Sequence, residues 1–243
     1  MCQLIDYGSR LRLGVIVPSG NVIAEPQIHA MLPEGVVAYM TRLELRGSSE
    51  PELLEMSRHV ESGAKLLSDA QVDAVVFHCT AVSTFSPSMG EDIEDRIAKA
   101  SGLPAISTSE AILTALRALN AKKIVLLTPY IESVNAREVA FLQHHGFEVL
   151  EEVGLGVNTN AEMAKLSPQI WVDLASKHQR EDADAYFISC TAVRSAEVIE
   201  EIEALVGRPV ITSNQAMVWY ALRKNAIANQ QPGFGSLFSI TSI

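Results

Sequence analysis

Two cysteines, Cys79 and Cys190, are the residues of this sequence best suited to chemistry. Each ends a short apolar run and begins the same four letters, CTAV. A thiolate is both a nucleophile and a base, and nearby backbone N–H groups can lower the pKa of a thiol from about 8.5 to roughly 3.5–7.5. The duplicated thiol therefore indicates nucleophilic or proton-transfer chemistry that uses both sulfurs.

Other patterns that could carry chemistry are weaker. Cys2 is not expected to have a role, and His78 is expected in the core or behind Cys79, because neighbouring side chains on a strand point to opposite faces. The sequence has no His/Cys spacing typical of a zinc site. It also lacks the glycine-rich loops that bind nucleotide phosphates. We therefore expect neither a metal ion nor a cofactor.

Composition excludes several kinds of partner. The net charge of −10 and the absence of a basic stripe argue against nucleic acid, which requires clustered positive charge. No segment approaches the roughly 18 uninterrupted apolar residues of a transmembrane helix, so no membrane partner is expected. The first residues lack a secretory signal, and three cysteines is an odd, low number for a disulfide scaffold. These features predict a cytoplasmic protein with reduced thiols, and they leave assembly into a homo-oligomer open.

Short apolar runs alternate with amphipathic stretches along the first half of the chain. The expected strands are 12–18, 36–45, 73–79 and 103–108. The expected helices are 21–32 with Asn21 as a cap, 51–70, 91–100 and 109–119. Strands that alternate with helices predict an α/β fold in which a parallel sheet is covered by helices on both faces.

The second half of the chain repeats the pattern of the first. Three pairs of segments match in the same order: 122–135 with 10–21, 184–194 with 73–83, and 208–225 with 103–120. One match could arise by chance, but three in order indicate two pseudo-symmetric lobes. The expected boundary lies near 118–122, between a first lobe of 1–120, to which 211–243 could return, and a second lobe of 121–210.

Both cysteines are expected at the carboxyl ends of their strands, where ligands bind in open parallel sheets. Two facing lobes would bring the CTAV turns to one cleft, with the sulfurs about 6–10 Å apart, too far for a disulfide. Backbone N–H groups and hydroxyls of these turns are expected to bind a substrate carboxylate. The residues concerned are Thr80, Ala81, Thr191 and Ala192.

Five motifs resemble the aspartate/glutamate/hydantoin racemase superfamily, and within it the branch of maleate cis–trans isomerase and arylmalonate decarboxylase. They are VPSGN at 17–21, HCTAV at 78–82, TPY at 128–130, NAEMAKLSP at 160–168 and SCTAV at 189–193. The resemblance covers roughly residues 10–225. It implies cofactor-free chemistry on a small carboxylate or dicarboxylate, in a cleft between the two lobes.

The resemblance also implies roles for individual residues. In the isomerases of this branch the first cysteine adds to the double bond of a cis-dicarboxylate, the bond rotates, and elimination gives the trans acid. Cys79 would be this nucleophile and Cys190 its proton-handling partner. The residues that would orient the carboxylates are Asn21, Tyr130 and Asn160. Asn158 is an alternative to Asn160, and Arg194 is either a second carboxylate anchor or a surface residue.

Departures from the family patterns narrow the range of activities that we expect. The first turn reads PSGN rather than an acidic DSG-type turn, which argues against an aspartate or glutamate racemase. Arylmalonate decarboxylases keep only the second cysteine, so Cys79 argues against that activity, although TAVS and TAVR after the cysteines are closer to the racemases. We therefore expect an isomerase that acts by cis–trans isomerisation or by racemisation beside a carboxylate. The alternatives are an arylmalonate-type decarboxylase with Cys190 as proton donor, and a non-catalytic small-acid binding protein.

Overall fold

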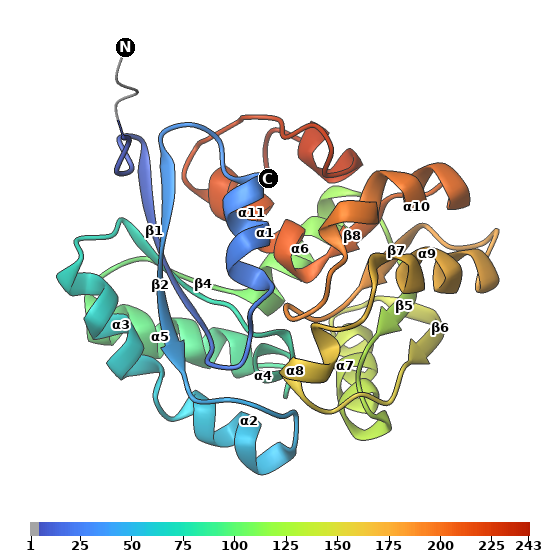
Figure 1. Cartoon of the computed structure of the whole chain (residues 1–243), viewed down its shortest axis with the longest axis horizontal. Coiled ribbons are helices and arrows are strands. Elements are labelled where there is room, and N and C mark those ends of the chain that lie inside the picture. The colour runs from blue at the N-terminus through green and yellow to red at the C-terminus, as the bar shows by residue number, and fades with distance from the viewer. Residues whose placement is uncertain (1–4) are drawn as a thin grey trace.

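Residues 5–243, which a computed structural model describes, contain two four-stranded sheets with the same strand order (Figure 1). The first sheet has the order β2-β1-β3-β4 and the second β6-β5-β7-β8, and all neighbouring strands are parallel. The strands are β1 Leu11–Pro18, β2 Val36–Leu43, β3 Ala74–Phe77, β4 Ala105–Ser107, β5 Lys123–Thr128, β6 Glu148–Gly154, β7 Ala185–Ile188 and β8 Val210–Thr212. The matching orders agree with the duplication seen in the sequence. Cys2 lies outside the described residues.

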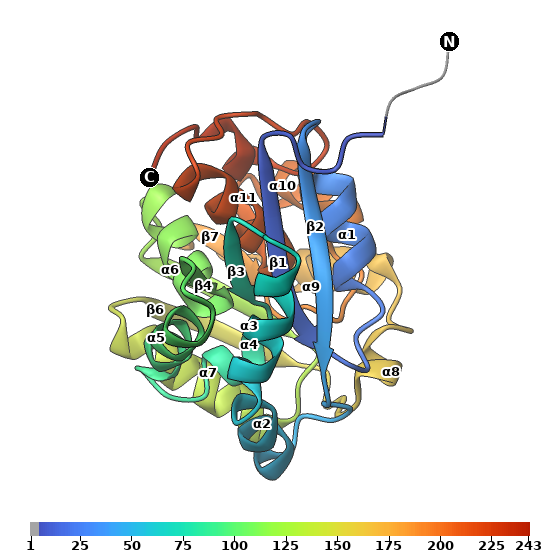
Figure 2. The same cartoon turned by 90° about the vertical axis from the view of Figure 1, so that its left-hand side faces the viewer.

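Helices follow the strands and cover both sheets. They are α1 Ala24–Met31, α2 Glu50–Ser57, α3 Val60–Asp69, α4 Thr80–Ser83, α5 Met89–Ser101, α6 Thr108–Ala118, α7 Glu132–His144, α8 Asn160–Met163, α9 Pro168–Lys177, α10 Ile199–Val206 and α11 Ser213–Lys224, with 3-10 helices at Ala196–Val198 and Ser236–Ser239. Figure 2 shows α3 and α5 on the side of the first sheet that faces away from the second. In Figure 1, α6 and α11 lie between the two sheets and pack against each other.

One expected helix, 51–70, is wrong as a single element, because the chain forms α2 and α3 with a break between them. The Ser57 hydroxyl donates to the Leu54 carbonyl, which is a bond that bends helices. The N–H groups of Arg58 and His59 then bond three residues back rather than four. The apolar spacing continues across this bend, so periodicity alone does not reveal it.

Side chains of the central strands alternate between two hydrophobic clusters. On β1, Leu13, Val15 and Val17 belong to one cluster and Ile16 to the other. The first cluster includes side chains of α1, α6 and α11 and joins the two sheets. Both faces of each sheet are therefore buried, as expected for parallel strands that carry continuous apolar runs.

The helix α11 is buried along most of its length, so the packing around it determines its position. Thr212 accepts a bond from the N–H of Gln215, and the Gln215 side chain returns one to the Thr212 N–H, which forms a capping box. This cap fixes where the helix begins, directly after β8. Because α11 packs on α6 and α1, it lies against elements that follow strands of the first sheet. The division into lobes at 120 and 210 stays a prediction.

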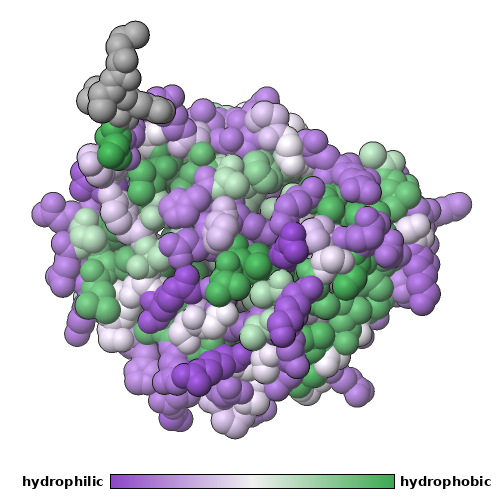
Figure 3. Space-filling model, viewed as in Figure 1, coloured by the Kyte–Doolittle hydropathy of each residue, from purple (hydrophilic) through white to green (hydrophobic). Residues whose placement is uncertain are grey.

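The surface is mixed in character. On the face shown in Figure 3, hydrophilic side chains separate the larger hydrophobic areas. Among residues 5–243, no helix combines the length and the apolar character needed to cross a membrane.

Arg223 on α11 generates a prediction about stability. Its buried guanidinium donates to four carbonyls of the C-terminal segment, those of Ile227, Asn229, Phe238 and Ile240. Arg223→Met leaves these carbonyls without their donor, so we expect the free energy of unfolding to fall by about 3 kcal/mol.

Urea unfolding measures this loss, and limited proteolysis of 226–243 should accelerate in the same variant. The control is Arg180→Met, because the Arg180 side chain is 38% exposed and pairs with neighbouring Asp182. We expect this control to stay within about 0.5 kcal/mol of the unsubstituted protein. Equal unfolding midpoints for the two variants would contradict the stabilising role of the Arg223 hydrogen bonds.

Candidate active site

Cys79 and Cys190 lie at the carboxyl ends of β3 and β7, which occupy equivalent positions in the two sheets. Cys79 precedes the short helix α4, and Cys190 has a φ of +98°, a conformation that non-glycine residues rarely adopt. That conformation lets the Ala192 N–H donate to the Cys190 Sγ at 3.3 Å. Both thiols are free and only 4% exposed. They are close enough for a charge on Cys190 to raise the pKa of Cys79.

The first residue of α11, Ser213, connects the two cysteine turns. Its Oγ accepts a hydrogen bond of 2.8 Å from the hydroxyl of Thr80, the residue after Cys79. The same oxygen accepts a bond of 3.1 Å from the Cys190 N–H. One buried hydroxyl therefore holds together two turns that belong to different sheets.

A second connection runs through His78, which precedes Cys79 and is fully buried. Its Nδ1 lies 3.0 Å from the Thr108 hydroxyl, and its Nε2 lies 2.7 Å from the Asn214 Oδ1. The Asn214 amide donates to the Gln27 Oε1 and to the carbonyl of Thr191, the residue after Cys190. This network links the strand end that bears Cys79 to the turn that bears Cys190.

The hydrogen bonds of Gln27 determine which groups donate and which accept along this network. The Gln27 amide donates to the Val193 carbonyl and to the Glu197 carboxylate, so its oxygen accepts from Asn214. The Asn214 oxygen is then left as an acceptor, which places the hydrogen of His78 on Nε2. Burial lowers the pKa of His78 from 6.5 to about 4, so the ring is neutral near pH 7.

Asn21 joins the lobes at a third point. Its Nδ2 donates to the Thr191 hydroxyl at 3.0 Å, while its Oδ1 accepts from the N–H groups of Ile23 and Ala24 at the start of α1. The expectation that Asn21 is the cap residue of this helix is wrong, because α1 begins at Ala24 and its cap residue is Ile23. The Asn21 side chain instead accepts from the turn before α1 and also reaches the second cysteine turn. Because its amide group lies beside that turn, its orientation is set by both lobes.

Tyr130 lies beside Cys190, in the turn after β5. Its N–H donates to the Thr128 hydroxyl at 3.1 Å, which fixes the turn, and the residue is 3% exposed. The phenol neighbours the Cys190 thiol and lowers its pKa. The Met163 sulfur lies 3.7 Å from the Cys190 Sγ. The second thiol is therefore enclosed by an aromatic ring, a thioether and its own turn.

Burial controls the ionisation of both thiols. It raises the pKa of Cys79 to about 12, against which the N–H groups of Val82 and Ala81 act in the lowering direction. It also raises the pKa of Cys190 to about 12, against the lowering effect of Tyr130. The expectation of thiols with a pKa below the ordinary value is therefore wrong for the site as it stands. The expected N–H donors are present, but desolvation of the thiolate outweighs them.

The loops after β2 and β6 meet at the outer side of the site. Gly47 and Thr159 form an antiparallel bridge, and the Asn160 Nδ2 donates to the Leu45 carbonyl at 3.2 Å. The Asn158 side chain instead accepts from the Ser48 hydroxyl at 3.0 Å. A surface hollow of about 520 Å³ lies here, lined by Ser19, Gly20, Arg46, Thr159, Asn160 and Ala161. Both asparagines hydrogen-bond across the two loops, and of the two only Asn160 lines this hollow.

Arg194 lies at the surface rather than beside the thiols. Its side chain is 47% exposed, and its Nε is 3.7 Å from a Glu197 carboxylate oxygen. Of the two roles considered for it, the surface arginine is the one that its position supports.

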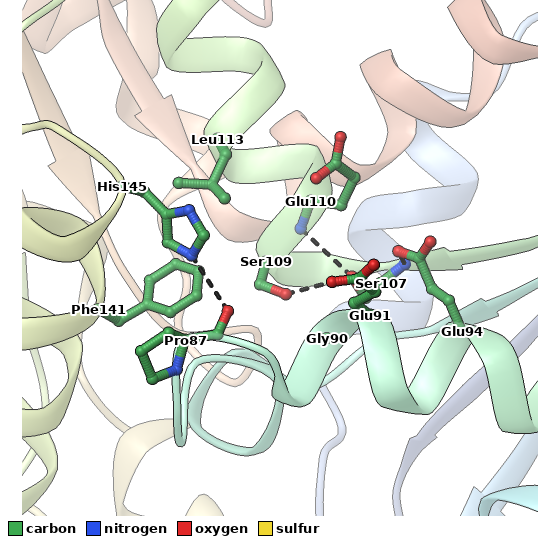
Figure 4. A pocket seen from close by; sticks show the side chains of 10 residues that line it. All are labelled: Pro87, Gly90, Glu91, Glu94, Ser107, Ser109, Glu110, Leu113, Phe141 and His145. Carbon is green, nitrogen blue, oxygen red and sulfur yellow. Dashed lines mark hydrogen bonds between the residues drawn. The ribbon is translucent and has the colours of Figure 1, made fainter.

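A separate hollow of about 370 Å³ lies between α5, α6 and α7 (Figure 4). Three of its lining side chains are the carboxylates of Glu91, Glu94 and Glu110, and neither cysteine lines it. Burial raises the pKa of Glu94 in this group. A concentration of negative charge repels a carboxylate substrate, so the thiols remain the better candidate site. Within the described part of the chain, no group of three or more His, Cys, Asp or Glu residues could hold a metal ion.

The sequence alone does not identify the residues that connect the two cysteine turns, which are Ser213, Asn214 and Gln27. The third repeated segment contained a signal for the first two, because SN at 213–214 matches TS at 108–109, both directly after a strand. Such a match indicates polar residues at a strand end. It does not show which turns those residues contact.

His78 generates a prediction about pH. Its pKa is about 4 in the folded protein and 6.5 as the reference value, so its stabilising contribution is fully present above pH 6.5 and is lost as the pH falls through about 4. This difference corresponds to about 3 kcal/mol. His78→Gln keeps polar atoms but cannot titrate, so its stability should fall less between pH 7 and 4 than that of the unsubstituted protein. Urea unfolding at both pH values measures the difference, with exposed His59→Gln as control. If stability depended on pH in the same way in His78→Gln and His59→Gln, the lowered pKa of buried His78 would be contradicted.

Comparisons with known proteins agree on one family. The family model of arylmalonate decarboxylase matches residues 13–238. A maleate isomerase of Geobacillus stearothermophilus is 28% identical, in a match that covers 94% of this chain and 97% of that protein. An arylmalonate decarboxylase of Bordetella bronchiseptica is 29% identical, and the match covers 95% of this chain and 84% of that protein.

A solved structure has the same fold. Maleate isomerase Iso from Pseudomonas putida S16, crystallised with maleate as a cysteine-to-alanine variant, superposes with a TM-score of 0.92 at 26% identity. That match covers 95% of this chain and 98% of the other. The expected α/β fold with two pseudo-symmetric lobes and the expected superfamily branch are confirmed, and the names of the relatives support the expectation of an isomerase. Because the family model spans nearly all of the sequence, this chain belongs to the arylmalonate decarboxylase family.

Proposed function

We propose that the protein is a cofactor-independent isomerase that uses Cys79 and Cys190 on a small carboxylic acid. The observation that carries this proposal is the shared hydrogen bonding of the two cysteine turns through Ser213. Maleate-type cis–trans isomerisation is the leading reaction. Four relatives that match over most of the chain, at 25–28% identity, are named maleate isomerase.

In this reaction the Cys79 thiolate adds to one alkene carbon of the cis-dicarboxylate. A carbon–sulfur bond forms, and the π electrons move to the other alkene carbon, where the adjacent carboxylate shares the charge. Cys190 gives its proton to that carbon and becomes a thiolate. The former double bond is now a single bond, so it can rotate.

The second half reverses these steps. Cys190 takes the proton back, the electrons re-form the double bond, and the carbon–sulfur bond breaks. The trans acid leaves, and both cysteines return to their starting states. Racemisation beside a carboxylate would use the same pair, with one sulfur removing a proton from one face of the carbon and the other delivering a proton to the opposite face.

Neutral donors are proposed to hold the substrate carboxylates while charge develops on them. They are Asn21, Thr80, Ala81, Tyr130, Asn160, Thr191 and Ala192. Tyr130 and the turn N–H groups already lie beside a thiol, where they lower its pKa. Because the site excludes water, each such bond stabilises negative charge more than it would in solution.

A decarboxylase is the second candidate, favoured by the family model and by the Bordetella bronchiseptica relative. In that reaction one carboxylate leaves as carbon dioxide, and the remaining enediolate accepts a proton from Cys190. Cys79 would have no essential role. A small-acid binding protein would use the same donors without either thiol reacting.

Proton NMR in deuterated water with maleate, aspartate, hydantoins and aryl malonates separates these functions. We expect conversion of maleate to fumarate without added cofactor. Cys79→Ala and Cys190→Ala should each lower the rate by roughly 10²–10⁴, because each removes a group that transfers a proton or forms a bond. The control is Cys2→Ser. A rate that depends on Cys190 alone would instead support the decarboxylase, and binding without turnover would support the binding protein.

Tyr130→Phe tests one of the proposed donors to the substrate carboxylates. The ring volume is kept and only the hydroxyl is lost, so we expect a folded enzyme. If the phenol bonds a carboxylate more strongly in the transition state, kcat should fall by roughly 10²–10³ while KM changes less. Tyr39→Phe is the control, because the Tyr39 hydroxyl donates to the Tyr7 carbonyl away from the thiols. An unchanged kcat would make Tyr130 a packing residue.

A further inference from the structure

A buried carboxyl group, Glu138 on α7, lies behind the second thiol. Glu138 is 1% exposed, and its Oε1 accepts a 2.6 Å hydrogen bond from Ser189, the residue before Cys190. Its Oε2 is buried and has no partner among the described residues. Burial raises the pKa of Glu138 from 4.5 to about 7, so it ionises near neutral pH. Buried carboxylates are costly without partners, which makes this group unusual.

Glu138 acts on two groups of the site. Burial is the largest cause that raises the pKa of Cys190 and of Tyr130, and the charge of Glu138 acts in the same direction on both. Of the charged groups on adjoining elements, Arg137 pairs with Glu50 through Nη1, while its Nη2 is buried without a partner among the described residues. Glu152 of β6 accepts from the Asn135 amide. Within the site, the ionisation of Glu138 therefore affects the second thiol and its phenol neighbour.

The first lobe has no such charge at the matching position. Gln27 and Glu138 each lie nine residues after a proline, Pro18 and Pro129, on the helix that follows the first strand of a sheet. Gln27 is a buried neutral amide whose oxygen and nitrogen are both hydrogen-bonded. The duplicated fold therefore places an amide at this position in one lobe and a carboxyl in the other.

We propose that Glu138 is a positioning residue whose carboxylate keeps the proton on Cys190, so that the two similar thiols enter the reaction in opposite protonation states. A negative charge beside a thiol disfavours the thiolate. The two thiols also repel each other's charge, because ionised Cys190 raises the pKa of Cys79. Only one thiolate is then favoured. The Tyr130 phenol and the Ala192 N–H favour it at Cys190, and the charge of Glu138 opposes them and shifts the balance toward Cys79. The inference rests on the proposed function, which needs one thiolate and one thiol.

Peptide-resolved alkylation with iodoacetamide across a pH series tests this assignment. The measured quantity is the ratio of Cys190 to Cys79 alkylation in the same sample. This ratio cancels differences between samples in reagent concentration and reaction time. In Glu138→Gln we expect this ratio to rise severalfold above pH 7, because glutamine carries no charge that disfavours the Cys190 thiolate. As the pH falls through about 7, Glu138 becomes protonated, so the variant and the unsubstituted protein should converge. The matched control is Glu132→Gln, exposed on the same helix, and it should not change the ratio.

Ser189→Ala is the second variant. It removes the hydrogen bond that lowers the pKa of Glu138, so the pH of convergence should move upward. This variant also tests the proposal if Glu138→Gln does not fold. Ratios in both variants equal to those in Glu132→Gln would overturn the proposal. Alkylation needs no turnover, so an enzyme inactive on every acid would refute the proposed function while the ratio still reports on Glu138.

Discussion

The hydrogen bonds at the start of α11 are the interaction on which the site depends. Ser213 accepts from Thr80 and from the Cys190 N–H, and Asn214 joins His78 to the turn after Cys190. These groups are buried, so leaving any of them unpaired would cost roughly 1–3 kcal/mol. Because α11 is itself enclosed by the core between the sheets, hydrophobic packing fixes the helix whose first residues make these hydrogen bonds.

Burial then sets the electrostatics. Water is excluded from both thiols, which raises the pKa of each to about 12 and makes a thiolate dependent on the few donors around it. The same exclusion strengthens every bond to a developing negative charge. A site of this kind suits a reaction in which charge appears only while substrate carboxylates occupy the neutral donors.

Duplication supplies two similar strand ends, but the two lobes differ in the residues around each cysteine. His78 precedes the first cysteine and is neutral within a chain of amides and hydroxyls, whereas Ser189 precedes the second and bonds to Glu138. A symmetric pair of thiols would have no reason to divide acid and base roles. In the proposed reaction, the difference between the amide of Gln27 and the carboxyl of Glu138 would be one physical source of that division.

The sequence by itself determined the alternation of strands and helices, the duplication of the segments and the two cysteines, because apolar periodicity and repeated motifs report local burial. It could not show the break near His59, which depends on a local hydroxyl bond that leaves the apolar spacing intact. Only the tertiary structure decided that Arg194 lies at the surface, that Ser213 joins the two cysteine turns, and that burial raises the thiol pKa values. These properties arise where segments far apart in the chain meet, and desolvation depends on everything packed around a group rather than on its neighbours in sequence.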